Sequence, residues 1–176
     1  MISTISTETA YQKYVVVAIV SWMIVFSIAC NEIIRSNYAT FVEAVDAGET
    51  IRGWIPDYLP ESSRNIHLIH GISPSITWCT FEFSPDDVQV FKEVLKTKID
   101  FLPARLQQIK RPDSLWPEFL SGNLDIDKIH ENGFSSYVLE RKCYQGLDHT
   151  ALLFFVIDWK NGKGFFHNTI CQKNNI

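Results

Sequence analysis

The sequence predicts an α+β protein in which an N-terminal membrane segment precedes a small antiparallel sheet of about four strands packed with two or three helices. Three observations support this fold class. A long run near the N-terminus has no charged residue, several later stretches are rich in β-branched and aromatic residues, and helix-start signals lie between those stretches. We therefore divide the chain into residues 1–34, a tail with a transmembrane or signal segment, and residues 35–176, a single α+β domain.

The apolar run from Tyr14 to Cys30 is the first element. If it is helical and continues to Ile34, it is long enough to cross a hydrocarbon core of about 30 Å. The residues Ser27-Ile28-Ala29-Cys30 also resemble a lipobox, in which the cysteine becomes lipidated. A buried core helix is the third interpretation, and the absence of a polar stripe at helical spacing disfavours it.

An uncleaved anchor and a lipid on Cys30 share one consequence, which is a domain held at a membrane. We therefore predict the membrane as a partner. Lys13 and Arg35 flank the apolar run, so the positive-inside rule gives almost no preference for one orientation. We expect the domain to lie on the extracytoplasmic, periplasmic side, because both interpretations of the run favour export.

Helix and turn signals follow the apolar run. Residues 38–47 have apolar side chains at helical spacing, and Gly48 stands where a helix C-cap is expected. The segment from Gly53 to Pro60 contains two prolines and two aromatic residues, which is typical of an extended, packed turn. Residues 61–70 predict a second short helix that stops at Gly71.

The middle of the chain predicts a strand, a helix and a long connection. Residues 76–83 are rich in β-branched and aromatic residues and predict a strand. Ser84 and Pro85 then provide an N-cap and a first-turn proline for a helix with apolar residues at core spacing. Residues 101–133 are broken by prolines, and we expect a partly structured connection of the kind that often carries function.

The C-terminal part predicts a three-stranded meander over residues 134–142, 151–158 and 164–170. Asn161 and Gly162 form a typical hairpin turn between the last two strands. The middle strand is apolar on both faces, so we expect it to be central and covered on both sides.

Charge and cysteine content exclude some classes of protein. The chain has 16 Lys and Arg against 20 Asp and Glu, a net charge of −4, and shows no basic footprint for nucleic acid. We therefore expect no nucleic-acid partner. Apart from Cys30, the thiols are Cys79, Cys143 and Cys171, and three thiols cannot all pair with one another.

Two histidine-containing pairs are candidates for chemistry. His67 and His70 are three residues apart on the expected helix, a spacing that can direct two imidazoles at one metal ion. Asp148 and His149 lie in an expected turn and form a candidate acid–base pair. No nucleophile motif, phosphate-binding loop or metal-binding motif accompanies either pair. We therefore predict no metal and no cofactor.

The segment Gly53-Trp-Ile-Pro-Asp-Tyr-Leu-Pro-Glu-Ser-Ser63, followed by His67, Trp78 and Phe81-Glu-Phe83, resembles a pattern in small uncharacterised bacterial envelope proteins. Those proteins share a lipoprotein or membrane signal, a Trp-x-Pro-x-x-Leu-Pro-x-Ser segment and a closing hairpin. No activity is known for the family. The resemblance implies an envelope location and supports the anchor without assigning a function.

These observations favour an uncharacterised, membrane-anchored envelope protein with a non-enzymatic binding or interaction domain. Its expected partner is another envelope protein or an envelope component. The alternative is a hydrolase-like or metal-dependent enzyme that uses His67 with His70 or Asp148 with His149. The predicted binding residues are those with aromatic, imidazole or proline side chains in the first half of the domain: Trp54, Pro56, Tyr58, Pro60, His67, His70 and Trp78.

Overall fold

The computed structural model describes residues 33–71, 76–96, 106, 108–109, 112–142, 149–169 and 172–173. They belong to one compact unit, Ile33–Ile176. The predicted apolar run with Cys30, and also Cys143, Asp148 and Cys171, lie outside the described residues.

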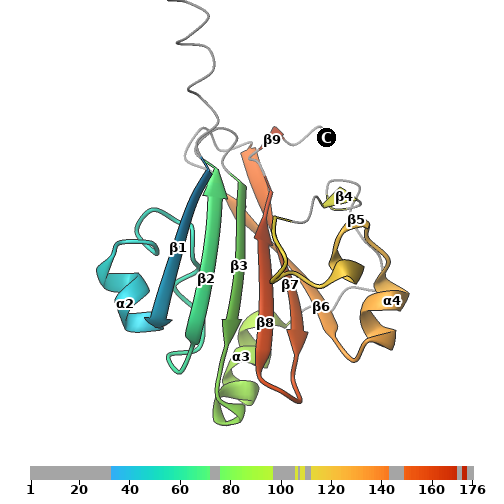
Figure 1. Ribbon diagram of the computed structural model, residues 1–176, viewed down its shortest axis with the longest axis horizontal. Coiled ribbons are helices and arrows are strands. Elements are labelled where there is room, and N and C mark those ends of the chain that lie inside the picture. The colour runs from blue at the N-terminus through green and yellow to red at the C-terminus, as the bar shows by residue number, and fades with distance from the viewer. Residues whose placement is uncertain are drawn as a thin grey trace, which may run out of the picture. The chain divides into compact units, whose positions relative to one another are not determined.

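The unit is built on one antiparallel sheet in the order β1-β2-β3-β8-β7-β6 (Figure 1). A short strand, β9, pairs with β7, and β4 pairs with β5 in a separate small sheet. The strands are β1 (Ile33–Thr40), β2 (Arg64–Gly71), β3 (Ile76–Glu82), β4 (Gln108–Ile109), β5 (Gly122–Asn123), β6 (Ser135–Lys142), β7 (His149–Asp158), β8 (Lys163–Asn168) and β9 (Gln172–Lys173). The helices are α2 (Phe41–Asp46), η1 (Pro85–Asp87), α3 (Val88–Leu95), η3 (Glu118–Leu120) and α4 (Ile126–Glu131).

The predicted fold class is wrong. The main sheet has six strands in its continuous path instead of about four, and the helices are few and short. Within the described ranges, no helix has the length and apolar character needed to cross a membrane. The difference in strand number comes from β1 and β2, which the sequence patterns assigned to the end of the membrane segment and to helices.

The segment 61–70, predicted as a helix, instead forms most of β2. Ile66, Leu68 and His70 are buried at every second position, which is the period of a strand. Asn65 has a positive φ of 49°, and the β2–β3 register shifts between Arg64 and His67. This irregularity at the start of the strand obscured its alternating pattern.

The helix predicted at residues 38–47 is present in a shorter form. Tyr38 belongs to β1, and α2 begins only after Thr40, whose side chain accepts a hydrogen bond from the Glu43 N–H. The strand at β3 and the helix at α3 are confirmed, with Ser84 and Pro85 in the predicted capping positions of the preceding turn η1. The expected connection also contains α4, a helix of six residues that the sequence patterns did not predict.

The C-terminal meander β6-β7-β8 is confirmed, with Gly162 at a positive φ in the hairpin turn. As expected, β7 is buried on both faces. One face joins a cluster with Phe81, Phe91 and Phe166, and the other joins a cluster with Trp116 and Phe165.

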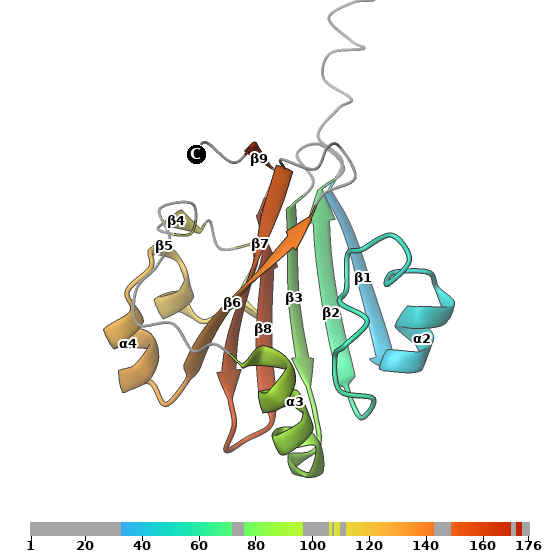
Figure 2. The same ribbon diagram turned by 180° about the vertical axis from the view of Figure 1, so that it is seen from behind.

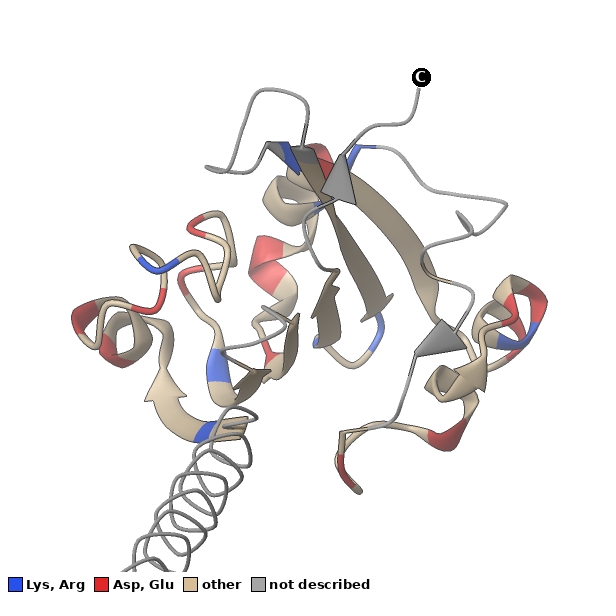
Figure 3. Cartoon of the chain, turned by 90° about the horizontal axis from the view of Figure 1, so that it is seen from above, with Lys and Arg blue, Asp and Glu red and all other residues tan. Residues whose placement is uncertain are grey.

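Different elements cover the two faces of the sheet. Helix α3 and the segment 53–60 pack on one face, which is turned toward the viewer in Figure 2. The connection from 112 to 134, including α4, packs on the other face over β6, β7 and β8. On this second face β1, β2 and β3 bear a groove, described below. Charged residues of both signs are distributed over several elements of the described chain (Figure 3).

Candidate functional site

The sheet separates the residues predicted to form a binding site. Since neighbouring side chains of a strand point to opposite faces, His67 and His70, three positions apart on β2, lie on opposite sides of the sheet. His70 lies on the face with the segment 53–60, and Trp78 of β3 lies on the face with His67. The two imidazoles therefore cannot bind one metal ion.

The segment from Trp54 to Pro60 is packed into the fold. Ile55, Leu59 and Pro60 are buried, and Pro56 is half-buried. The N–H groups of Trp54 and Ile55 donate to the Glu49 carbonyl at 3.0 and 3.3 Å. This arrangement explains the predicted extended turn: its prolines and aromatic residues anchor the chain against the sheet.

Trp54 lies against His70, with ring centroids 3.4 Å apart. His70 is almost completely buried, and neither of its ring nitrogens has a hydrogen-bond partner. Desolvation lowers the pKa of His70, although the nearby Glu49 carboxylate opposes this shift. His70 is therefore a neutral core histidine, shielded from any ligand in solution.

Tyr58 packs its ring 6.2 Å from that of Phe155, and its buried hydroxyl has no hydrogen-bond partner. Desolvation raises the pKa of Tyr58 to about 12. The side chain therefore contributes its apolar ring to the core, while its hydroxyl costs desolvation energy.

We expect Tyr58→Phe to leave the free energy of unfolding unchanged or to raise it by up to about 1 kcal/mol, because only an unpaired hydroxyl is removed. The matched control is Tyr38→Phe, whose hydroxyl donates to Glu49. It should lower the free energy of unfolding by about 1 kcal/mol or more. Urea titrations monitored by circular dichroism measure both values. A loss of stability in Tyr58→Phe as large as that in Tyr38→Phe would contradict the assignment.

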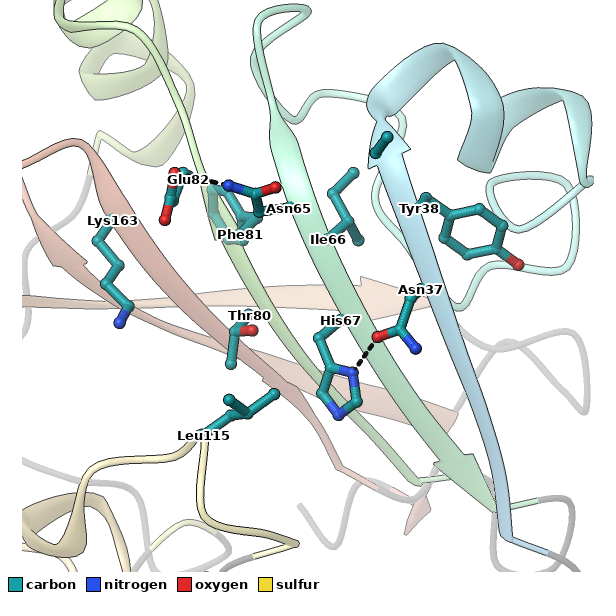
Figure 4. A pocket seen from close by; sticks show the side chains of 11 residues that line it. Asn37, Tyr38, Asn65, Ile66, His67, Thr80, Phe81, Glu82, Leu115 and Lys163 are labelled. Atoms are coloured by element: carbon teal, nitrogen blue, oxygen red, sulfur yellow. Dashed lines mark hydrogen bonds between the residues drawn. The ribbon is translucent and has the colours of Figure 1, made fainter.

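The second face bears a groove of about 450 Å³ over β1, β2, β3 and the start of β8. We call it the open-face groove (Figure 4). Polar side chains and apolar surface both line it, and Leu115 from the connection stands at its edge. Tyr38, Ile66 and Phe81 also line it, and the remaining lining residues are Asn37, Ala39, Asn65, His67, Thr80, Glu82 and Lys163.

One end of the groove is organised around His67. Its Nδ1 contacts the Asn37 side-chain oxygen, and its Nε2 lies 2.8 Å from the Asp113 carboxylate. The other Asp113 oxygen accepts the Leu115 N–H at 2.9 Å. This series of contacts joins β1, β2 and the connection, so His67 positions the loop that carries Leu115.

The other end of the groove contains paired charges. Glu82 accepts a hydrogen bond of 3.0 Å from the Asn65 side chain and lies 3.5 Å from the Arg64 guanidinium. The Lys163 ammonium lies 5.4 Å from the centre of the Phe165 ring. Charges of both signs therefore surround this end of the groove.

Thr80 lies in the middle, on β3 directly opposite His67. In the described part of the chain, its hydroxyl has no hydrogen-bond partner, and neither do the Asn37 amino group and the Asn65 side-chain oxygen. These groups offer a bound molecule both hydrogen-bond donors and hydrogen-bond acceptors.

Trp78 lies beyond Thr80 on the same face of β3 and outside the groove lining. Its ring stacks on His167 at a centroid distance of 5.4 Å. His167 is buried, and its Nδ1 lies 3.0 Å from the Thr77 carbonyl oxygen. Desolvation lowers the pKa of His167 to about 4. This pair is part of the packing of the sheet.

Other candidates for chemistry find little support among the described residues. No group of three or more His, Cys, Asp or Glu side chains there is arranged to hold a metal ion. Cys79 is a free thiol, completely buried, and burial raises its pKa. His149 begins β7, and its predicted partner Asp148 lies outside the described residues.

The sequence patterns did not identify most of the groove. Asn37, Thr80 and Lys163 come from three separate strands and converge only through strand pairing, and Asp113 joins the site from the connection through its contact with His67. The polar positions on alternate residues of β3 were the one available signal, because a strand with polar residues on one face leaves that face accessible. His67 was identified, but on the wrong type of element.

Comparison with known proteins relates part of the chain to a family model. We found no curated protein and no solved structure that matches the chain significantly. Residues 32–82 match the family model described as the YbbD head domain, a range that includes β1, α2, the segment 53–60, β2 and β3. The match fits the resemblance to a small bacterial envelope-type family and identifies this part of the chain as similar to a YbbD head domain.

Proposed function

We propose that the chain is a non-enzymatic binding domain and that its open-face groove holds a polar ligand. The observation that carries this proposal is the groove itself, about 450 Å³ in volume, whose lining combines polar side chains from four strands with apolar residues such as Leu115. Its volume is within the range of roughly 300–1,000 Å³ typical of small-molecule sites. Side chains on paired strands are held rigidly, so the groove is preorganised for binding.

The state of His67 supports binding over catalysis. A general base needs a ring nitrogen that can reach the proton of a substrate or of water. In His67, both nitrogens already contact protein acceptors, Asn37 and Asp113. Of the hydroxyl groups on groove-lining residues, that of Tyr38 donates to Glu49, and that of Thr80 forms no hydrogen bond with His67. The histidine therefore acts as a structural link between β1, β2 and the connection.

The hydrolase-like alternative loses one of its two residue pairs, because the sheet separates His67 from His70. The pair Asp148 and His149 stays a prediction. We propose that Trp54, Pro56, Tyr58 and Pro60 act chiefly by packing, since the segment is held against the core.

Amide chemical-shift mapping tests the proposal. A library of small polar fragments is added to the full-length ¹⁵N-labelled chain, and shifts are followed residue by residue. We expect fragments that bind to shift the amide resonances of Asn37, Thr80 and Lys163 more than those of Trp54 and Tyr58.

Thr80→Phe fills the middle of the groove and should abolish these shifts. Val90→Phe is the matched control, because Val90 is 68% exposed on α3, away from the groove, and it should bind like the wild type. Hits that move only the segment 53–60, or unchanged binding by Thr80→Phe with an unaltered unfolding midpoint, would contradict the proposal.

We also propose that the domain lies on the extracytoplasmic side and contacts an envelope component. The apolar run and the lipobox-like residues before Cys30 support this location. The intact mass of the protein extracted from membranes distinguishes an uncleaved anchor from a lipid on Cys30. A chain that begins at Cys30 with added acyl mass supports lipidation, and recovery of the whole protein in the cytoplasmic fraction would contradict the location.

A further inference from the structure

We propose that the ligand of the open-face groove is a short, uncharged oligosaccharide, an inference that rests on the proposed binding function. It follows from the hydrogen-bonding groups, the charges and the shape of the groove.

The free polar groups of the groove are mixed in kind. The Asn37 amino group donates, the Asn65 side-chain oxygen accepts, and the Thr80 hydroxyl does both. A phosphate offers acceptors alone and an ammonium offers donors alone, so each would leave part of this set unsatisfied. A hydroxyl pairs with either kind, and a ligand with many hydroxyl groups satisfies the whole set.

The charges around the groove favour a neutral ligand. Glu82 is paired with Arg64, and the Asp113 carboxylate lies 2.8 Å from the His67 Nε2. Lys163 is held over the ring of Phe165. A strongly charged ligand would meet a like charge at one end of the groove or the other, which costs binding energy. An uncharged ligand avoids this cost.

The shape of the groove favours sugar rings over a peptide. The groove extends across β1, β2, β3 and the start of β8, a width of roughly 14 Å at about 4.8 Å per strand spacing. Leu115, half-exposed, is its one large apolar side chain directed from the connection. A peptide requires a pocket for each alternate side chain. A sugar ring needs one apolar contact for its C–H face, and Leu115 provides it.

The test is a titration of the full-length ¹⁵N-labelled chain with chitotriose and with maltotriose. Pyrophosphate, spermidine and end-blocked trialanine serve as acceptor-only, donor-only and peptide probes. We expect one or both saccharides to move the amides of Thr80 and Leu115 saturably, and the other three probes to have no such effect.

Two variants examine the contacts. Thr80→Val keeps the shape of the side chain and removes its hydroxyl, so saccharide affinity should fall about fivefold. Thr50→Val, outside the groove, should have no effect. Leu115→Trp provides a larger face for a sugar ring and should raise affinity about fivefold, whereas Val90→Trp should not.

The outcomes separate this inference from the proposed function. Binding of trialanine alone, or fragment binding in the groove without binding of either saccharide, would overturn the oligosaccharide assignment and leave the binding function standing. Saccharide binding that is unchanged in both Thr80→Val and Leu115→Trp would overturn it as well. If no probe or fragment shifts the amide resonances of the groove residues, both proposals fail.

Discussion

Gly162→Ala is expected to lower the free energy of unfolding by about 3 kcal/mol. Gly162 has a φ of +62°, and an added Cβ would lie 2.2 Å from the Phe83 carbonyl oxygen. That oxygen belongs to the backbone, so it cannot turn away as a side chain would. The Phe83 N–H also donates to the Gly162 carbonyl at 2.7 Å, and separating the two segments would break this bond.

Gly133→Ala is the matched control for this substitution. Gly133 has a similar φ of +84°, but a Cβ there would meet no atom within 4 Å. Its free energy of unfolding should therefore fall by only about 1 kcal/mol, which is the strain of an alanine in the left-handed conformation. Urea unfolding of the two variants measures the difference. Equal losses would show that the close approach of Gly162 to Phe83 contributes nothing to stability.

The protein is expected to lose up to about 3 kcal/mol of stability between pH 6.5 and pH 4 through His167. Desolvation holds the pKa of His167 at about 4 in the folded protein, below its ordinary value of 6.5. Across this window the unfolded chain binds a proton at His167 that the folded chain does not, so acid favours unfolding. The stability that the neutral His167 contributes is complete above pH 6.5 and is lost as the pH falls toward 4.

His167→Asn isolates this effect. Asparagine has a side-chain N–H that can replace the donor to the Thr77 carbonyl, and it does not titrate. Unfolding free energies of the wild type and the variant are compared at pH 7.5 and pH 4.5. The variant should be the less stable protein at pH 7.5, because it loses the ring stacked on Trp78, and should lose about 2 kcal/mol less than the wild type on acidification. A parallel loss in both proteins would exclude His167 as the source.

The sequence patterns predicted the C-terminal half of the fold better than the N-terminal half. In β7 every residue from Ala151 to Ile157 is buried, so its composition indicates a central strand without ambiguity. In β1 the exposed and half-buried positions alternate without a clear apolar face, and the strand follows directly on the apolar run. Its strand character depends on pairing with β2, which is a long-range contact.

The candidate site was less predictable than the fold. The sequence predicted Trp54 and Tyr58 as binding residues. In the structure, their rings pack against His70 and Phe155. The polar Thr80 on β3 does not by itself predict a site, because it becomes part of a groove only when β2 and β8 pair on either side of β3. Aromatic residues are often core residues, and neutral polar residues rarely stand out in a single sequence.

The central claim, that the open-face groove binds a short oligosaccharide, is tested most directly by intermolecular nuclear Overhauser effects between the methyl groups of the protein and the saccharide that binds, chitotriose or maltotriose. We predict contacts from the sugar protons to the methyl groups of Leu115 and Thr80, which lie at the edge and in the middle of the groove. Contacts confined to exposed methyl groups away from the groove, such as those of Ile51 and Val90, would contradict the claim.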